Sequence, residues 1–427
     1  MVAAVGVVLP LMAVIQAVGF YHGHGSGNYI SRAYGRQDLE DAANMAATGF
    51  YGALFFGLAI TVLGLCFRVP LAGLLGAKTE ATLKHTVSYM SFILMATPFM
   101  TGSIVMNNQL RLQGNAFFSM IGLTSGAVLN LFLDPFLIYE SGRRIAALGI
   151  VMPAGAGMGV AGAALATGLS QVFSFIVLVI GLSRSDNVKI RLRNVRFQPH
   201  YIKGIWQGGL PSLVRQSMSS IATAALNHAV GLYLATPLMI DAAQAAMTGV
   251  SRILMVLASA LIGFGQGFQP VCGFNYGAGR YDRVVRAFRF CLRVALVVLL
   301  MLAVFGFVFA GPITDLVAGT SAEASRIAVF TFRAQLVTLP LSAWVILYNM
   351  MLQNIGITGK ATLLALSRQG LTFIPMVLLL PLLMRALGAE PLLGLELAQS
   401  AADVLAVLMA IPLGRSELKK LESMIPK

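Results

Sequence analysis

Long apolar runs follow one another along the whole chain, separated by short polar segments. Each run is about 20 residues or longer, the length that an α-helix needs to cross a hydrocarbon core of ~30 Å. Strands crossing a membrane would be about half as long and would alternate apolar with polar residues. The pattern therefore predicts an all-α polytopic membrane protein. We expect eleven spans, near residues 2–22, 43–67, 86–107, 117–139, 159–182, 209–233, 243–272, 288–311, 327–350, 361–384 and 392–413.

Composition agrees with this class. Hydrophobic residues make up 57% of the chain and charged residues 11%, whereas soluble domains carry about 25% charged residues. A mean hydropathy of +0.81 over the full length cannot come from one anchor attached to a soluble domain. The sequence excludes a mainly soluble protein.

The chain has a net charge of +14, and its basic residues are spread unevenly among the loops. Basic residues concentrate in alternate connections, which by the positive-inside rule face the cytoplasm. This assignment predicts a multi-pass membrane protein with a cytoplasmic C-terminus and with the lipid bilayer as its partner. A nucleic-acid site is the less favoured interpretation of the same clusters. The basic residues of this set are Arg32, Arg36, Arg111, Arg184, Lys189, Arg191, Arg193, Arg196, Lys203, Arg280, Arg283, Arg286, Lys360, Arg415, Lys419 and Lys420.

The sequence contains an internal repeat. Gly-Phe-Tyr-His-Gly at 19–23 and Gly-Arg-Gln-Asp at 35–38 recur as Gly-Phe-Gly-Gln-Gly at 263–267 and Gly-Arg-Tyr-Asp at 279–282, which is an offset of 244 residues. A weaker match relates Pro98, Asn107 and Gly114 to Pro340, Asn349 and Gly356 at an offset of 242. Transporters are often built from two homologous halves that handle substrate between them.

The repeat predicts two helical lobes. We expect an N-lobe over residues 1–182 with five spans, a basic cytoplasmic linker over 183–205, and a C-lobe over 206–427 with six spans. At the offset of 244, Met1 aligns with Ala245, and the second half continues upstream through one more span. We therefore expect that one helix is missing before Met1, through a misplaced start or a fragment. A natural eleven-span variant is the alternative.

Three Gly-rich blocks carry a family resemblance. They are Gly-Ser-Gly-Asn-Tyr-Ile-Ser-Arg-Ala-Tyr-Gly-Arg at 25–36, Gly-Val-Ala-Gly-Ala-Ala-Leu-Ala-Thr at 159–167, and Gly-Phe-Gly-Gln-Gly-Phe-Gln-Pro at 263–270 followed by Gly-Phe-Asn-Tyr-Gly-Ala at 273–278. In this order the chain resembles the multidrug and toxic compound extrusion (MATE) transporters, in their bacterial drug-efflux and DNA-damage-inducible branch. The resemblance implies twelve helices in two lobes and exchange of cytoplasmic drugs for external Na⁺ or H⁺.

Asp134 is the clearest functional candidate, because an ionisable side chain inside a span is costly and is kept for a purpose. Asn130 lies four residues earlier on the same helix face, and Thr167 lies at a similar depth on the next span. Pro135 donates no N–H and can leave a backbone carbonyl free. These oxygens suit a hard cation or a proton. An aspartate that merely sits near a kinked helix end is the alternative.

The resemblance places a cation site at these three positions, completed in the family by an aspartate on the first helix, which this chain lacks. The coupling ion would be Na⁺ or H⁺, and we expect no other cofactor. In the C-lobe, Arg252 and Asp403 are expected at similar depth, so we predict that they form a structural pair. Arg368 and Glu396 are close enough to span ends to reach the interface. The C-lobe spans over 209–233 and 243–272 contain no aspartate or glutamate, so coupling is expected in the N-lobe.

Polar residues inside spans or at their inner ends are the candidates for substrate binding. Asn107 and Asn349 gain weight because the repeat relates them. We expect small organic substrates and a monomer. The candidates are Gln16, Asn107, Asn108, Gln216, Asn227, Gln266, Asn349 and Gln353.

Three function classes follow. We favour the first, a cation-coupled drug antiporter working by alternating access, over the second, a flippase for lipid-linked oligosaccharides. The third class is a membrane-embedded enzyme, and we predict that this chain is not one. A separate alternative to the antiporter is an inactive truncated copy of it. The sequence contains no HExxH, no nucleotide-binding loop and no paired carboxylates in register.

Overall fold

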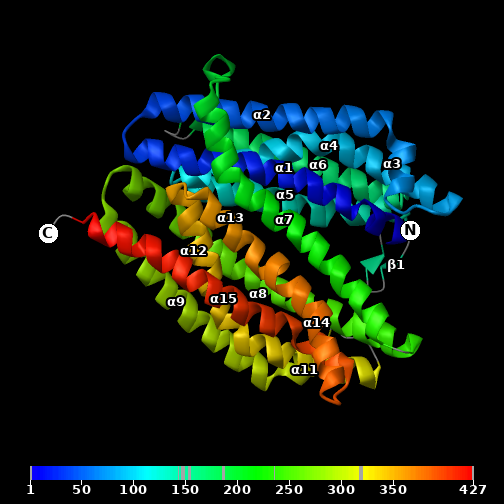
Figure 1. Cartoon of the computed structure of the whole chain (residues 1–427). Helices are drawn as coiled ribbons and strands as arrows, with labels where there is room; N and C mark the ends of the chain where they lie inside the picture. Colours follow the sequence, from blue (N-terminus) through cyan, green and yellow to red (C-terminus); the bar gives the residue numbers. More distant parts are fainter. Residues whose placement is uncertain are drawn as a thin grey trace. The chain divides into compact units, whose positions relative to one another are not determined.

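The structure is a computed structural model that describes residues 2–142, 144–145, 150–151, 155–184, 188–234, 236–316 and 321–425. Helices dominate these residues (Figure 1). The strands in the described part are β1 (Arg144–Ile145) and β2 (Ile150–Val151), which are two residues long each and pair antiparallel. The all-α fold class predicted from the apolar runs is confirmed.

The chain forms two compact units, Met1–Leu213 and Val214–Lys427. The division falls inside one continuous helix, α7 (Pro199–Tyr233), and not in the predicted linker over 183–205. Of that linker, residues 185–187 lie outside the described residues. The boundary lies later because the first half of α7 packs on helices of the first unit, as described below.

The first unit consists of helices that precede α7 together with its first half. Figure 1 shows α1, α2 and α4 running alongside one another. The elements are α1 (Val2–Gly35), α2 (Leu39–Cys66), α3 (Arg68–Leu74), α4 (Glu80–Leu112), α5 (Ala116–Ile138), α6 (Val160–Arg184) and the short 3-10 helix η1 (Leu192–Asn194).

The second unit repeats this order with two interruptions. A 3-10 turn separates α11 from α12, and a π-helical turn separates α13 from α14. The elements are α8 (Pro237–Gly277), α9 (Tyr281–Val308), α10 (Ala310–Asp315), α11 (Ala322–Thr338), η2 (Leu339–Leu341), α12 (Ser342–Ile355), α13 (Thr358–Leu366), η3 (Ser367–Thr372), α14 (Phe373–Ala386) and α15 (Pro391–Ser423).

Ten helical segments among the described residues are long and apolar enough to cross a membrane. Each coincides with one of the eleven predicted spans. The remaining prediction, 209–233, lies within α7, which is helical over 35 residues but does not reach the same apolarity. Polar and basic side chains, among them Arg215 and Asn227, account for the difference.

The structure fixes the register of the internal repeat at 242 residues. Helices α2, α3, α4 and α5 begin at residues 39, 68, 80 and 116, and their counterparts α9, α10, α11 and α13 begin at 281, 310, 322 and 358. Helices α1 and α8 end at 35 and 277, again 242 apart. The offset of 244 predicted from the first glycine block was therefore wrong by two residues.

Turn geometry explains this correction. The left-handed residue after α1 is Gln37 (φ 62°), and its counterpart after α8 is Gly279 (φ 71°), 242 positions later. The next turn pair, Gly114 (φ 89°) and Gly356 (φ 86°), has the same separation. Matching glycine to glycine misaligned the first pair, because a non-glycine residue occupies the left-handed position in the first lobe.

Close contact between α1 and the first half of α7 depends on glycine. A Cβ atom added at Gly25 would overlap the backbone carbonyl oxygen of Ile205, and one added at Gly208 would lie 3.0 Å from the Cα atom of Gly25. His24 and Ser212 join the same two helices, with 3.2 Å between Nδ1 and Oγ. Small residues allow this approach, and α7 thereby begins as part of the first unit.

Candidate functional site

Helices α5 and α6 lie antiparallel and in close contact, which sets the depth of the candidate residues. A Cβ atom at Gly126 would lie 2.9 Å from the carbonyl oxygen of Ser170. Eleven residues further along α5, the carbonyl oxygen of Leu137 lies where a Cβ atom of Gly162 would be. Between these two contacts, the middle of α5 faces the layer of α6 that contains Thr167.

Asn130 and Asp134 meet in this layer. The Asn130 Nδ2 atom donates a hydrogen bond of 3.3 Å to Asp134 Oδ1, as their spacing of one helical turn predicts. Both side chains are half-buried. Pro135 follows directly and interrupts the hydrogen-bond ladder of α5. The carboxylate therefore keeps oxygen atoms that can accept a cation or a proton.

Thr167 lies at the level of this pair along α6, and no hydrogen bond to the pair is among the interactions described. Its hydroxyl donates a hydrogen bond of 3.0 Å to the carbonyl oxygen of Ala163, one turn earlier on α6. The oxygen atom of Thr167 still has acceptor capacity, since a hydroxyl can donate and accept at once. The structure thus joins two of the three predicted residues and places the third in the same layer.

Tyr89 is a neighbour that the sequence interpretation missed. It lies on α4, is 5% exposed, and interacts electrostatically with Asp134. Its only signal in the sequence is a lone phenol at the start of the span predicted over 86–107. Among the residues that the structure describes, no group of three His, Cys, Asp or Glu side chains could hold a metal ion. One carboxylate with neutral oxygens suits a monovalent cation or a proton better than a divalent metal.

The predicted pair of Arg252 and Asp403 is wrong. Asp403 is paired with Arg368 instead, through a hydrogen bond of 2.8 Å from Nε to Oδ1. Gln399 donates a second bond of 2.9 Å to the same oxygen. Arg252 is exposed on α8. The prediction used depth along the helices alone, and depth does not say which face of a helix a side chain occupies.

Asn107 and Asn349 perform the same structural task in the two lobes. Asn107 Nδ2 donates to the carbonyl oxygen of Ser119 over 2.8 Å, and Asn349 Nδ2 donates to that of Ala361 over 2.6 Å. In each case the acceptor lies twelve residues later, on the next helix. These asparagines close equivalent helix hairpins, so their repeat symmetry reflects folding and gives no support to a role in substrate binding.

The other predicted substrate residues are buried, half-buried or exposed. Asn108 is 2% exposed, bonded to the carbonyl oxygen of Ile104 at 2.8 Å, and Gln353 is 1% exposed. Gln16, Gln216 and Gln266 are half-buried. Asn227 is exposed on α7. The three half-buried glutamines stay the candidates for contact with a substrate.

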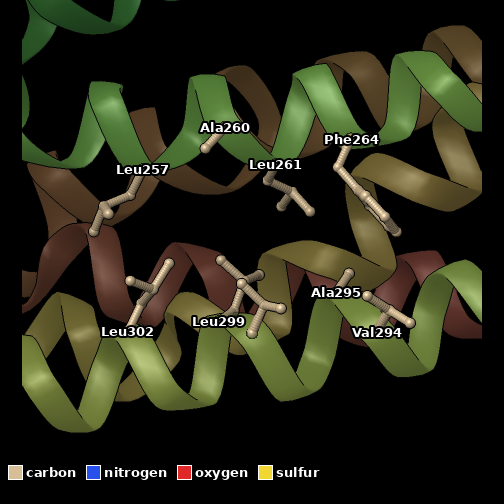
Figure 2. A pocket seen from close by; sticks show the side chains of 9 residues that line it. Leu257, Ala260, Leu261, Phe264, Val294, Ala295, Leu299 and Leu302 are labelled. Atoms are coloured by element: carbon tan, nitrogen blue, oxygen red, sulfur yellow. The ribbon is translucent and has the colours of Figure 1, made fainter.

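A cavity of about 100 Å³ lies between α8 and α9. Figure 2 shows side chains of both helices directed into it. Because every lining residue is apolar, this cavity offers shape but no group to orient a ligand. The lining residues are Leu257, Ala260, Leu261, Phe264, Val294, Ala295, Val298, Leu299 and Leu302.

Comparison with known sequences gives one family. The model of the MatE family matches residues 1–136 and 211–379, which together are most of the chain. The multidrug export protein MepA of Staphylococcus aureus (strain MRSA252) is 27% identical over 415 residues, covering 96% of this chain and 85% of MepA. MepA of Staphylococcus haemolyticus (strain JCSC1435) is 26% identical over 382 residues, covering 89% and 79%.

Solved structures agree. A multidrug resistance MATE family transporter of the MOP superfamily in an outward-facing conformation has a TM-score of 0.86 at 26% identity, covering 99% of this chain and 89% of its own. A MOP superfamily transporter from Pyrococcus furiosus, described as having a binding pocket of reverse polarity, has a TM-score of 0.84 at 25% identity, covering 98% and 88%.

Proposed function

This chain belongs to the MatE family of transporters, and from that premise we propose that it is a cation-coupled antiporter that exports drugs or other amphipathic organic compounds. Its similarity to MepA, a multidrug export protein, supports drug export. We place it in the bacterial inner membrane as a monomer with a cytoplasmic C-terminus. Alternating access of the two lobes would carry the substrate across.

The observation that carries cation coupling is the carboxylate of Asp134 inside the first unit. It is half-buried in a helix of membrane-spanning length, and its described polar neighbours are the neutral side chains of Asn130 and Tyr89. A charge in that position is costly without a counter-ion. Binding of Na⁺ or H⁺ would remove the free-energy cost of this buried charge, and release would restore it. Cation binding could thereby shift the conformational equilibrium of the lobe.

The neighbouring groups support this exchange. Asn130 donates a hydrogen bond to the carboxylate and holds it in place. Thr167 supplies an oxygen from the facing helix at the same depth. Amide and hydroxyl groups keep the net charge of the site at that of one carboxylate, so a single monovalent cation neutralises it.

The test is transport by the purified chain in lipid vesicles that contain ethidium, with either a Na⁺ gradient or a pH gradient imposed. We expect ethidium movement with one gradient and none without. Movement that needs no gradient would overturn the coupling, and no movement of any organic compound would overturn drug export. An anionic dye in parallel vesicles tests substrate charge, because a similar transporter has a pocket of reverse polarity.

A further inference from the structure

Helix α15 carries a polar face in an otherwise apolar helix. Glu396, Gln399, Ser400 and Asp403 are spaced at i, i+3, i+4 and i+7, so they share one side. Three of them are buried, with exposures of 6% for Glu396, 8% for Ser400 and 3% for Asp403. Polar groups buried in a membrane helix need hydrogen-bond or ion-pair partners, or else a function. The four residues differ in the partners they have.

The carboxylate of Asp403 has an ion-pair partner and a further hydrogen-bond donor. Arg368 donates to both of its carboxylate oxygens, over 2.8 Å and 3.5 Å, and Gln399 adds a third bond. Arg368 lies in the π-helical turn η3 (Ser367–Thr372), where the Thr372 hydroxyl bonds to the carbonyl oxygen of Ser367, five residues earlier, at 2.8 Å. The pair is charge-balanced, which anchors one end of the polar face.

Glu396, at the other end, has no such arrangement. Among the residues that the structure describes, no cation lies within 4.0 Å of its carboxylate. Arg326 on α11 acts on Glu396 from further away, but its guanidinium is bonded to Glu323 at 2.8 Å. Glu323 and Glu390 add negative charge nearby. A buried carboxylate with two acidic neighbours and a cation already bonded elsewhere is poorly placed to stay ionised.

Other helices packed against α15 also carry basic groups. Three of them are bonded elsewhere: Arg333 of α11 to the carbonyl oxygen of Phe307, Arg289 of α9 to Glu422, and Lys360 of α13 to Glu417. Arg385, in the last turn of α14 and eleven residues before Glu396, has an exposed side chain.

Ser400 lies between the two carboxylates. Its residue is 92% buried by the exposure given above, and its Oγ atom has no hydrogen-bond partner. It follows Glu396 by one helical turn and precedes Asp403 by three residues. A buried hydroxyl without a partner costs free energy, unless it serves a group that binds there.

We propose that Glu396 is a reversible proton-binding site in the second unit, with the hydroxyl of Ser400 beside it and the Arg368–Asp403 pair as its fixed end. The carboxylate takes up one proton to become a neutral acid, which can lie in this buried setting without a counter-ion. Release of the proton restores a charge that only water or a displaced Arg326 could balance. The site itself rests on geometry, and its use in export rests on the proposed function.

Infrared spectroscopy of the purified full chain in lipid tests the site without transport. A protonated carboxylic acid has a carbonyl stretch that an ionised carboxylate lacks. We expect such a band at neutral pH that disappears at alkaline pH. Part of this band should be lost in Glu396→Gln and kept in Asp134→Asn. The control Glu140→Gln, an exposed carboxylate of the first unit, should keep the whole band. Size-exclusion chromatography checks that each variant remains folded and monodisperse.

The outcomes separate this proposal from the proposed function. Absence of the band in the unmodified chain, or a band of unchanged intensity in Glu396→Gln, overturns the site even if vesicles export ethidium. A band that follows Glu396, in a chain that moves no organic compound, keeps the site and overturns the transport function. Where both hold, Glu396→Gln should lower proton-driven export at least tenfold.

Discussion

One carboxylate controls the behaviour expected of the first unit. We predict that Asp134→Asn lowers gradient-driven ethidium export at least tenfold, which is a loss of about 1.4 kcal/mol or more. The amide has nearly the same shape but carries no negative charge to balance a cation and cannot take up and release a proton. Transport in vesicles measures the effect. The matched control is Glu140→Gln, an exposed carboxylate just beyond the same helix, which should export normally.

Equal export by Asp134→Asn and the unmodified chain would remove Asp134 from coupling. Loss of export in both variants would point to a general effect of charge on folding or insertion. Heating of each variant in detergent, followed by chromatography, distinguishes a folded but inactive chain from a damaged one.

The sequence predicted those site residues that one helix holds together. Asn130 and Asp134 are one turn apart on α5, so their contact follows from helix geometry. Tyr89 comes from another helix, and no local pattern assigns it to Asp134. The partner of Asp403 was mispredicted for the same reason, because hydropathy gives depth but leaves rotation about the helix axis open.

The π-helical turn between α13 and α14 contains Arg368, whose ion pair with Asp403 can be tested by substitution. We expect Arg368→Met or Asp403→Leu alone to destabilise the chain by about 3 kcal/mol or more, since each leaves a buried charge unpaired. The double substitution should recover most of that loss, because apolar side chains of similar size need no partner. Thermal unfolding in detergent measures all three.

Arg252→Met is the control for this cycle, since Arg252 is exposed and takes no part in the pair. It should change stability little. A double variant no more stable than the worse single would show that the two side chains are not coupled, contrary to the 2.8 Å bond.

The two helix hairpins closed by Asn107 and Asn349 can be tested in the same way. Asn107→Ala and Asn349→Ala each remove an amide that bonds to a backbone carbonyl of the next helix. We expect a loss of about 1–3 kcal/mol for each, the cost of leaving a buried acceptor without its donor. The residues lie in different units, so the losses should add in the double variant. Drug specificity should not change, and a changed substrate range would restore the original interpretation.

Over the molecule as a whole, hydropathy predicted ten of the helical segments because a membrane imposes length and apolarity together. The internal repeat predicted two lobes. It could not predict that the compact units divide within α7, since that depends on which helix the first half of α7 contacts. Matching glycines misjudged the repeat by two residues, because the left-handed turn position holds Gln37 in one lobe and Gly279 in the other.

The repeat also supplies a matched pair of glycines that tests the contact between α1 and the first half of α7. Gly25 and Gly267 are equivalent at 242 residues, yet a methyl group at Gly25 would overlap the carbonyl oxygen of Ile205, while at Gly267 it would meet nothing within 4 Å. Alanine favours a helix over glycine by about 1 kcal/mol, and overpacking costs about 1–3 kcal/mol. We therefore expect Gly25→Ala to destabilise the chain and Gly267→Ala to be neutral or stabilising.

Thermal unfolding of both variants in detergent decides the sign. The backbone of Ile205 cannot move aside without moving α7, which continues into the second unit and donates a 2.7 Å hydrogen bond there, from the Tyr233 hydroxyl to the carbonyl oxygen of Leu378. A loss confined to Gly25→Ala would mean that the crossing with α1 holds the first half of α7. Equal behaviour of the two variants would mean that α7 is held by its second half alone, and that the two lobes do not differ at this position.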